Sequence, residues 1–143
     1  LVTYLSTDKG YIIRLFRGEK IIESLTQFCE DQNIHSGLFH GIGAIENPEL
    51  GYYHLDRKEY EFRTIEKMLE IVSLTGNVAL VDGKPFLHIH TVVSDETFQT
   101  YGGHLKEGIV GATCEIYLTD FEIDIKREFD EKTGLKLLTC TTE

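Results

Sequence analysis

The chain has 143 residues, 41% of them hydrophobic and 27% charged, which is enough to bury a core as one ordinary domain. Fourteen Lys and Arg against 24 Asp and Glu give a formal net charge of −10. Direct DNA binding depends heavily on basic side chains that neutralise phosphates, so this balance disfavours a stand-alone DNA-binding protein. No apolar run approaches the ~20 residues that cross a bilayer, so we expect no membrane partner.

Cysteine usage indicates a reducing compartment. Cys29, Cys114 and Cys140 are odd in number, widely spaced and without a CxxC pair, which favours free thiols over a disulfide framework. The first residues lack the basic start and long apolar stretch of a signal peptide. We therefore expect a cytoplasmic protein.

A strand over 11–16 and a helix over Glu19–Gln32 are the first predicted elements. The apolar residues of this helix recur at helical spacing and form one stripe that includes Cys29, which we expect in the core. Asn33 suits the left-handed conformation that ends many helices.

The rest of the chain is predicted to be mainly β. Turn signals such as Glu46-Asn47-Pro48 and Thr75-Gly76-Asn77 separate the expected strands, and residues 64–68 could instead form a helical turn. One helix and many short antiparallel strands predict an α+β fold, a mainly antiparallel β-sheet with one principal helix packed on it, as a single domain over 1–143. We expect strands at 36–42, 49–54, 59–63, 69–75, 77–81, 86–93, 98–102, 109–119, 121–128 and 135–140.

The segment Gly41-Ile42-Gly43-Ala44 begins like a dinucleotide-binding fingerprint. Glu46 stands where the third glycine would be, and no helix is predicted to follow. A tight exit from a strand is the better interpretation of these glycines.

The most informative segment is the predicted strand over 86–93. Because side chains alternate along a strand, His88 and His90 share one face and their backbones are ~6.6 Å apart. Imidazoles at that spacing can meet at one metal ion, and His104 on the next predicted strand offers a third ligand. Buried histidines that hydrogen-bond to backbone or carboxylates remain the alternative interpretation.

The position of His104 depends on the strand register. If Val93 pairs with Phe98, His88 faces Gly103 and His104 points to the wrong face. An odd-length loop, or a bulge that the glycines at 102–103 would accommodate, shifts the count and places His104 opposite His88.

Three histidines would leave a fourth metal position open, as in catalytic zinc sites. Zinc-bound water has a pKa of about 7, so such a site could supply hydroxide at neutral pH. Glu115 shares a strand face with Thr113 and is a candidate second-shell base, although a surface carboxylate is an equal alternative. Cys114 points to the opposite face and is expected in the core.

Several motifs in this order resemble the plants-and-prokaryotes conserved (PPC) domain, in its prokaryotic stand-alone type. The likeness covers nearly the whole chain, and the combination is more specific than any single motif. It consists of Gly41-Ile42-Gly43-Ala44, Gly51-Tyr52-Tyr53, Leu74-Thr75-Gly76-Asn77, Phe86-Leu87-His88-Ile89-His90, Gly102-Gly103-His104-Leu105, Thr113-Cys114-Glu115 and Phe129-Asp130-Glu131-Lys132-Thr133-Gly134-Leu135.

The resemblance implies an antiparallel sheet with a flanking helix that assembles as a homotrimer. Prokaryotic members are often labelled predicted DNA-binding proteins, and plant members follow AT-hook segments, which this sequence lacks. The fold is also similar to that of α-acetolactate decarboxylase, whose zinc is held by histidines that include an HxH pair. This similarity implies zinc or another divalent transition metal at His88, His90 and His104, but it does not carry over the decarboxylase activity.

Three classes of function stay open. The first is a homotrimeric regulatory, DNA-associated or protein-binding module with a three-histidine metal site. The second is a zinc-dependent lyase or hydrolase that acts on a small acid or ester. The third is a small-molecule sensor that uses the same pocket without turnover. The first is favoured because the sequence shows no complete catalytic set.

Overall fold

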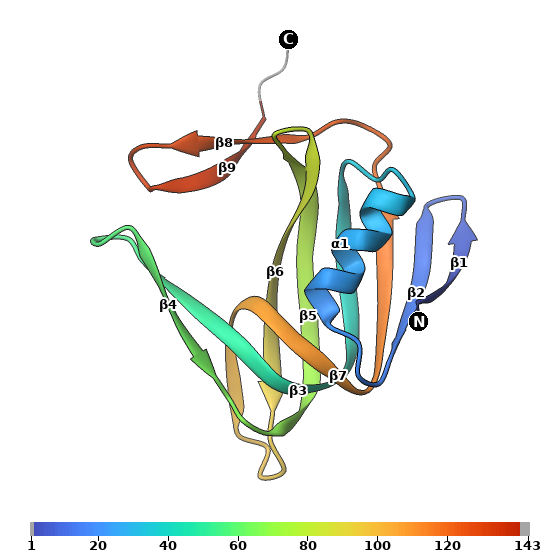
Figure 1. Ribbon diagram of the computed structural model, residues 1–143, viewed down its shortest axis with the longest axis vertical. Helices are drawn as coiled ribbons and strands as arrows, with labels where there is room; N and C mark the ends of the chain where they lie inside the picture. The colour runs from blue at the N-terminus through green and yellow to red at the C-terminus, as the bar shows by residue number, and fades with distance from the viewer. Residues whose placement is uncertain (1, 141–143) are drawn as a thin grey trace.

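The computed structural model describes residues 2–140 and confirms an α+β fold, with one mainly antiparallel sheet and a single helix in that part of the chain (Figure 1). The sheet runs in the order β1-β2-β7-β3-β5-β8-β9, and β4 and β6 pair at its side with β3 and with β5 and β7. The strands are β1 (Thr3–Thr7), β2 (Gly10–Phe16), β3 (Gly37–His54), β4 (Glu59–Thr64), β5 (Met68–Val81), β6 (Lys84–Ser94), β7 (Thr100–Asp120), β8 (Lys126–Asp130) and β9 (Leu135–Thr139).

Two of these strands, β3 and β5, each join two predicted strands, because an expected turn lies inside each of them. Residues 46–48 are an irregularity of β3, where Asn47 has a φ of 51° and the register against β7 shifts. Gly76 lies within β5 opposite Ile89 of β6. A Cβ at Gly76 would lie 2.1 Å from the carbonyl oxygen of His88, so this glycine permits close strand contact and does not form a turn.

The glycines at 41–43 are also not a strand exit, which corrects a further prediction. The chain continues through them in β3, and the register against β5 shifts between Gly41 and Gly43. A Cβ at Gly43 would lie 2.2 Å from the carbonyl oxygen of Thr113 in β7. Glycine is needed here because two backbones approach closely at a bulge.

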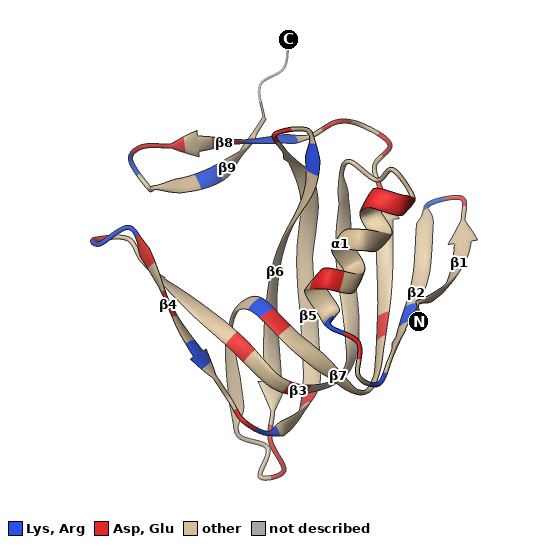
Figure 2. Ribbon diagram, in the orientation of Figure 1, with Lys and Arg blue, Asp and Glu red and all other residues tan. Residues whose placement is uncertain are grey.

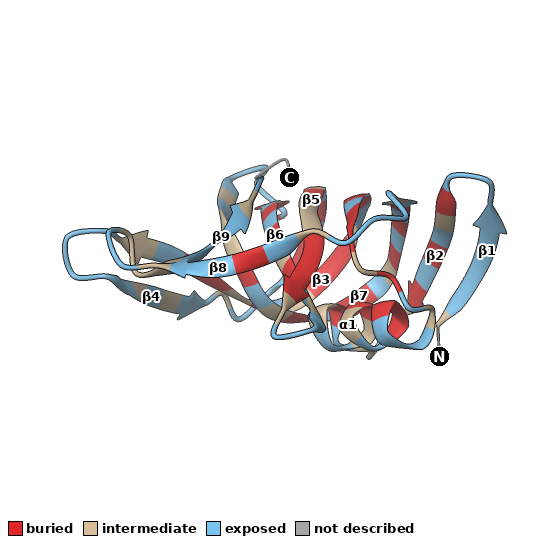
Figure 3. Cartoon of the chain, turned by 90° about the horizontal axis from the view of Figure 1, so that it is seen from above, coloured by how far each residue is buried: buried red, intermediate tan, exposed pale blue. Residues whose placement is uncertain are grey.

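Helix α1 (Ile21–Asp31) packs on one face of the sheet (Figure 3) and confirms the predicted stripe. Its buried residues include Cys29, and Cys114 of β7 is buried in the same core, as expected. Glu107 of β7 accepts hydrogen bonds from the backbone N–H groups of Ile22 and Glu23 at 2.9 and 3.1 Å. A carboxylate at this end complements the positive end of the helix dipole. Asn33, with a φ of 55°, follows the helix in the left-handed region.

The C-terminal hairpin β8–β9 lies beside the tip of the β3–β4 hairpin (Figure 1). Its one pairing with the main sheet joins Leu80 of β5 to Lys126 in parallel, and the hydroxyl of Tyr53 donates to the carbonyl oxygen of Thr133 at 2.5 Å. Residues 65–67 form no helical turn, because the N–H of Ile65 donates to the carbonyl oxygen of Pro48. Strand β1 was not predicted, and β8 is shorter than the expected strand over 121–128.

Candidate metal centre

Strand β6 presents His88 and His90 on one face, as the alternation of its side chains predicts. Leu87 and Ile89 are buried on the other face, toward the helix. A two-residue turn at Asp82-Gly83, with φ values of 51° and 78°, joins β5 to β6 and sets their register. The two histidines therefore belong to the sheet face that α1 leaves uncovered.

The loop that follows β6 brings His104 to the same face. Ser94 pairs with Thr100 around a loop over 95–99, and His104 pairs with His90. The loop has an odd number of residues, which is the alternative that the metal hypothesis requires. The register with Val93 opposite Phe98 is wrong, and so is the expectation that His104 stands opposite His88.

The side chain of Asp95 organises this loop. Its carboxylate accepts hydrogen bonds from the backbone N–H groups of Thr97 and Gln99 at 2.9 and 3.1 Å, and from the Thr97 hydroxyl at 2.7 Å. These bonds hold the pKa of Asp95 below its usual value, the Thr97 side chain contributing most. The β6–β7 pairing runs from Ser94 to His90 without a shift, so no bulge at Gly102 or Gly103 is needed.

The three histidines converge on one point. One ring nitrogen from each of His88, His90 and His104 lies within 4.8 Å of the others. The Nε2 atoms of His88 and His90 are 3.1 Å apart. Two imidazole nitrogens on one tetrahedral zinc ion are about 3.4 Å apart, given Zn–N bonds of 2.0–2.1 Å.

The surroundings of His88 and His104 favour the neutral form that binds metals. Burial lowers the pKa of His88 to about 4, assisted by the positive charge of Arg127. Burial also lowers the pKa of His104. Neutral imidazole is the ligand form, and the buried Nδ1 of His104 has no hydrogen-bond partner within residues 2–140. This donor set fits a transition-metal ion.

Aromatic residues of β4 support His104 from the side. The ring of Tyr60 lies 4.9 Å from that of His104 and stacks on Phe62 at 5.2 Å. Gly51 of β3 pairs with both His104 and Phe62, and a Cβ there would lie 2.7 Å from the Phe62 ring. The glycine therefore makes room for the aromatic rings beside the histidine.

Arg127 of β8 is the residue of this site that the sequence interpretation missed. Its Nη2 donates to Oδ1 of Asn77 at 2.7 Å and lies 3.4 Å from Nδ1 of His88, and its Nη1 donates to the carbonyl oxygen of Lys136 at 3.0 Å. Asn77 is the cross-strand partner of His88. The Lys126-Arg127 pair was the available signal, but a short basic pair is common at protein surfaces.

A pocket of about 200 Å³ separates the histidines from the C-terminal hairpin. His88, His104 and Arg127 line it together with Leu135, Lys136 and Leu137 of β9. The other lining residues are Tyr60, Phe86 and Gly134.

The sequence and the fold of the chain are similar to those of known proteins. The model of the Plants and Prokaryotes Conserved domain matches residues 2–122. The chain belongs to this family. Among solved structures, a Bacteroides thetaiotaomicron protein described as a candidate DNA-binding protein superposes on this PPC domain with a TM-score of 0.94 at 28% identity, covering 96% of both chains.

Two archaeal structures are also similar to this PPC domain. A plant- and prokaryote-conserved protein of Pyrococcus horikoshii gives a TM-score of 0.87 at 32% identity, with 99% of this chain and 97% of that one covered. A protein of Archaeoglobus fulgidus described as metal-containing gives 0.86 at 34% identity, with 97% and 98% covered.

A curated relative of this PPC domain is much longer. The bifunctional protein GlmU of Synechococcus sp. is 30% identical over 127 residues, which are 87% of this chain and 19% of GlmU. The chain thus spans about a fifth of that relative.

The remaining candidates of the PPC domain lie apart from the three histidines. Glu115 is exposed in β7, where it pairs with Arg14 and Ile42 and accepts a 3.5 Å hydrogen bond from Thr113. It does not join the histidine cluster within this protomer. His35 also lies outside the cluster and has an ordinary contact with Asp124 at 2.7 Å.

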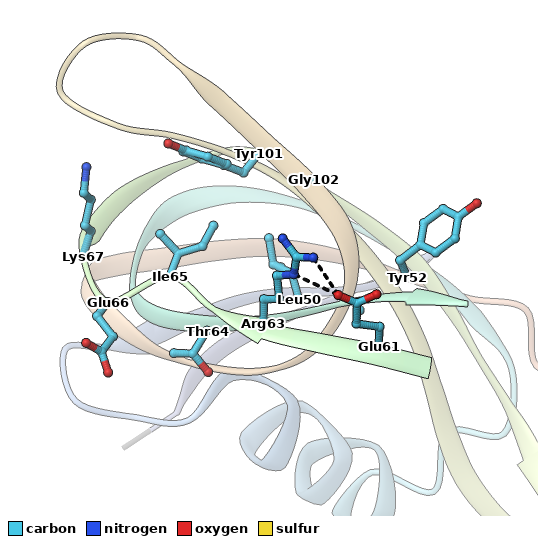
Figure 4. Close-up of a pocket in the computed structure, with 11 residues that line it drawn as sticks. Leu50, Tyr52, Glu61, Arg63, Thr64, Ile65, Glu66, Lys67, Tyr101 and Gly102 are labelled. Atoms are coloured by element: carbon cyan, nitrogen blue, oxygen red, sulfur yellow. Dashed lines mark hydrogen bonds and ion pairs between the residues drawn. The ribbon is translucent and has the colours of Figure 1, made fainter. Parts of the chain in front are cut away.

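A larger pocket, of about 680 Å³, lies between β4, β7 and the segment after β4 (Figure 4). Arg63 in its wall points toward Glu61 and forms an ion pair at 2.7 Å, as Figure 4 shows. Glu61 and Arg63 alternate with Tyr60 and Phe62 along β4, so this pocket lies on the opposite face of the strand from His104. Glu61, Arg63 and Lys67 of its lining have ion-pair partners, and it contains none of the three histidines.

Proposed function

We propose that this PPC domain is a regulatory module that binds one divalent transition-metal ion, zinc in our assignment, through His88, His90 and His104. The convergence of three ring nitrogens within 4.8 Å carries this proposal. The Archaeoglobus relative described as metal-containing supports it at 34% identity. Imidazole ligands suit zinc among other transition metals, and three of them leave a fourth position for a water or small ligand.

When bound, the metal would act as a Lewis acid toward a ligand oxygen. The residues of the chain have separate tasks around it. His88, His90 and His104 would hold the ion, and the rings of Tyr60 and Phe62 pack beside His104. Asn77 positions Arg127 beside His88 through a 2.7 Å hydrogen bond.

We also propose that three copies assemble through the sheet face without the helix. Exposed apolar side chains gather on it in neighbouring strands, where Ile12 of β2 pairs with Tyr117 of β7, and Leu38 and Ile42 lie on β3. Burying such side chains in a symmetric contact is favourable at roughly 25 cal/mol per Å². We expect a trimer by light scattering, and a monomer at all concentrations would contradict this assembly.

Direct DNA binding is not part of this proposal, although relatives are described with that function. Lys and Arg are distributed over several hairpins with Asp and Glu close to them (Figure 2), and the net charge is −10.

We propose protein partners, in the cytoplasm, where the three free thiols of Cys29, Cys114 and Cys140 are stable. No helix within residues 2–140 has the length and apolar content to cross a membrane.

A zinc-dependent lyase or hydrolase acting on a small acid or ester is the second candidate. The pocket that places Arg127 and Tyr60 beside the histidines favours it. Burial raises the pKa of Tyr60, which keeps its hydroxyl protonated and able to donate. Turnover of small acids or esters by the metal-loaded protein would identify this class, and ligand binding without turnover would identify a sensor.

Metal content tests the main proposal. Protein purified without added metal or chelator would be measured by elemental mass spectrometry beside His88→Ala/His90→Ala. The matched control is His35→Ala/His40→Ala, which alters two histidines outside the cluster. We expect close to one ion per chain, retained in the control and lost in the first variant. A metal-free wild type, or a folded His88→Ala/His90→Ala protein with unchanged metal, would contradict the proposal.

A further inference from the structure

Arg127 is a buried cation without an acidic partner. Its exposure is 9%, and no carboxylate of residues 2–140 forms an ion pair with it. The other buried charged residue, Asp95, has the hydrogen bonds of its own loop and Lys67 at 3.8 Å. Among the residues that the structure describes, Arg127 is therefore the buried charge without an opposite charge beside it.

The hydrogen bonds of Arg127 leave donors free. Oδ1 of Asn77 and the carbonyl oxygen of Lys136 are neutral acceptors, and the buried Nε has no partner among the described residues. A buried guanidinium without a counter-charge is costly, and arginine does not become neutral in proteins. An anion from outside the chain would complete this arrangement.

The lining of the pocket beside Arg127 indicates the polarity and size of the rest of the anion. Phe86, Leu135 and Leu137 line it together with Tyr60, so its walls are mostly apolar. Its volume of about 200 Å³ has room for roughly six water-sized groups, at about 30 Å³ each. The occupant is therefore small, with one charged end and an apolar remainder.

We propose that this pocket binds a small monocarboxylate, whose carboxylate pairs with Arg127 and whose apolar part lies against β9. A guanidinium fork matches the two oxygens of a carboxylate. A phosphate dianion carries a second charge, and Lys136, the other cation of the described pocket lining, is exposed to solvent, where its charge is hydrated. The proposal deepens the function proposed above by naming a ligand class, yet pairing with Arg127 does not require the metal.

Calorimetric titration with isobutyrate tests the proposal, with the uncharged isobutyramide as the matched control ligand and methyl phosphate as the competing anion. Both metal-loaded and metal-free protein are titrated. We expect isobutyrate to bind at least tenfold more tightly than isobutyramide in both forms, and at least tenfold more tightly than methyl phosphate in the metal-free form, where no metal ion adds positive charge beside the pocket. Equal binding of isobutyrate and isobutyramide, tighter methyl phosphate binding to the metal-free protein, or no isobutyrate binding would overturn the proposal.

Two variants locate the ligand. Arg127→Met keeps much of the side-chain length without the charge and should lower the affinity for isobutyrate at least tenfold. Arg63→Met, in the larger pocket, should leave the affinity for isobutyrate unchanged. The Nε–H resonance of Arg127 in wild-type protein should shift on addition of isobutyrate, which tests the contact even if Arg127→Met does not fold. An unmoved Nε–H resonance would overturn the assignment, and a metal-free wild type would contradict only the proposed metal function.

Discussion

His90 of β6 and His104 of β7 are direct cross-strand partners, whereas His88 stands two residues away opposite Asn77 of β5. The three proposed metal ligands therefore have different neighbours. His104 adjoins the aromatic rings of β4, and His88 adjoins the guanidinium of Arg127. The expected effects of substituting His104 and His88 follow from this difference in neighbours.

Removal of His104 should weaken metal binding strongly, because two imidazoles then remain on a single strand. We expect His104→Ala to lower zinc affinity roughly 100-fold or more, above the 10–100-fold range typical for loss of an outer-shell partner. Competition with a chromophoric chelator measures this. His40→Ala, on the same sheet face, is the control, and equal affinities in both variants would contradict the assignment of His104.

The stability of the metal-free protein should depend on pH through His88. Its folded-state pKa is lowered to about 4 from 6.5, by burial and then by the charge of Arg127. Between these values the unfolded chain binds more protons than the folded one, so the free energy of unfolding rises with pH from about 4 to 6.5. The stabilisation is fully present above the unfolded pKa and is lost as pH falls.

Urea unfolding at a series of pH values, followed by circular dichroism, checks this expectation. His88→Gln removes the titrating group, so its free energy of unfolding should depend less on pH across the same window. An identical pH profile in wild type and variant would show that His88 does not carry the effect.

Gly76→Ala should destabilise the fold and disturb the metal site together. The new Cβ would meet the carbonyl oxygen of His88 at 2.1 Å and Cα of Ile89 at 2.7 Å. We expect a loss of about 3 kcal/mol in urea unfolding. At Gly102 the nearest atom would be the Thr91 oxygen at 3.3 Å, so Gly102→Ala should cost clearly less. Equal losses would mean that β5 and β6 separate more easily than their pairing indicates.

Thiol labelling should distinguish the three cysteines. Burial raises the pKa of Cys29 and of Cys114 to about 12, so neither forms the reactive thiolate at neutral pH. Cys140 is exposed. The native protein should react with one equivalent of Ellman's reagent, and Cys140→Ser should react with none until denatured. Rapid labelling of two or three thiols in native protein would contradict the packing of the core.

The alternation of side chains along the sequence was sufficient to predict the part of the site that lies on one strand. The alternation around Leu87 and Ile89 predicted the shared face of His88 and His90, and Leu87 and Ile89 are buried on the opposite face. Whether the β6–β7 loop has an odd or an even number of residues depends on the hydrogen bonds that Asp95 accepts from Thr97 and Gln99. The alternation of side chains along the strands does not predict these bonds. The sequence therefore left two registers open for His104.

Glycine was the main source of wrong boundaries. Gly76 and the glycines at 41–43 are turn-formers in isolation, yet here each allows two backbones to approach within a continuous strand. Arg127 was missed for a related reason. Its role depends on a hairpin that returns to His88 from 39 residues away in the chain, and no local pattern records that contact.

The attachment of the β8–β9 hairpin has a consequence for dynamics. One parallel pair at Leu80 and Lys126, the bonds of Arg127 and the contacts at Tyr53 and Lys58 hold it. The histidines lie on β6 and β7, which pair along much of their length within the main sheet. Two-stranded ribbons are marginally stable and open locally more often than central strands. Amide protons of the hairpin should therefore exchange before those of β6 and β7, so the pocket can open for ligand entry while the three histidines stay together.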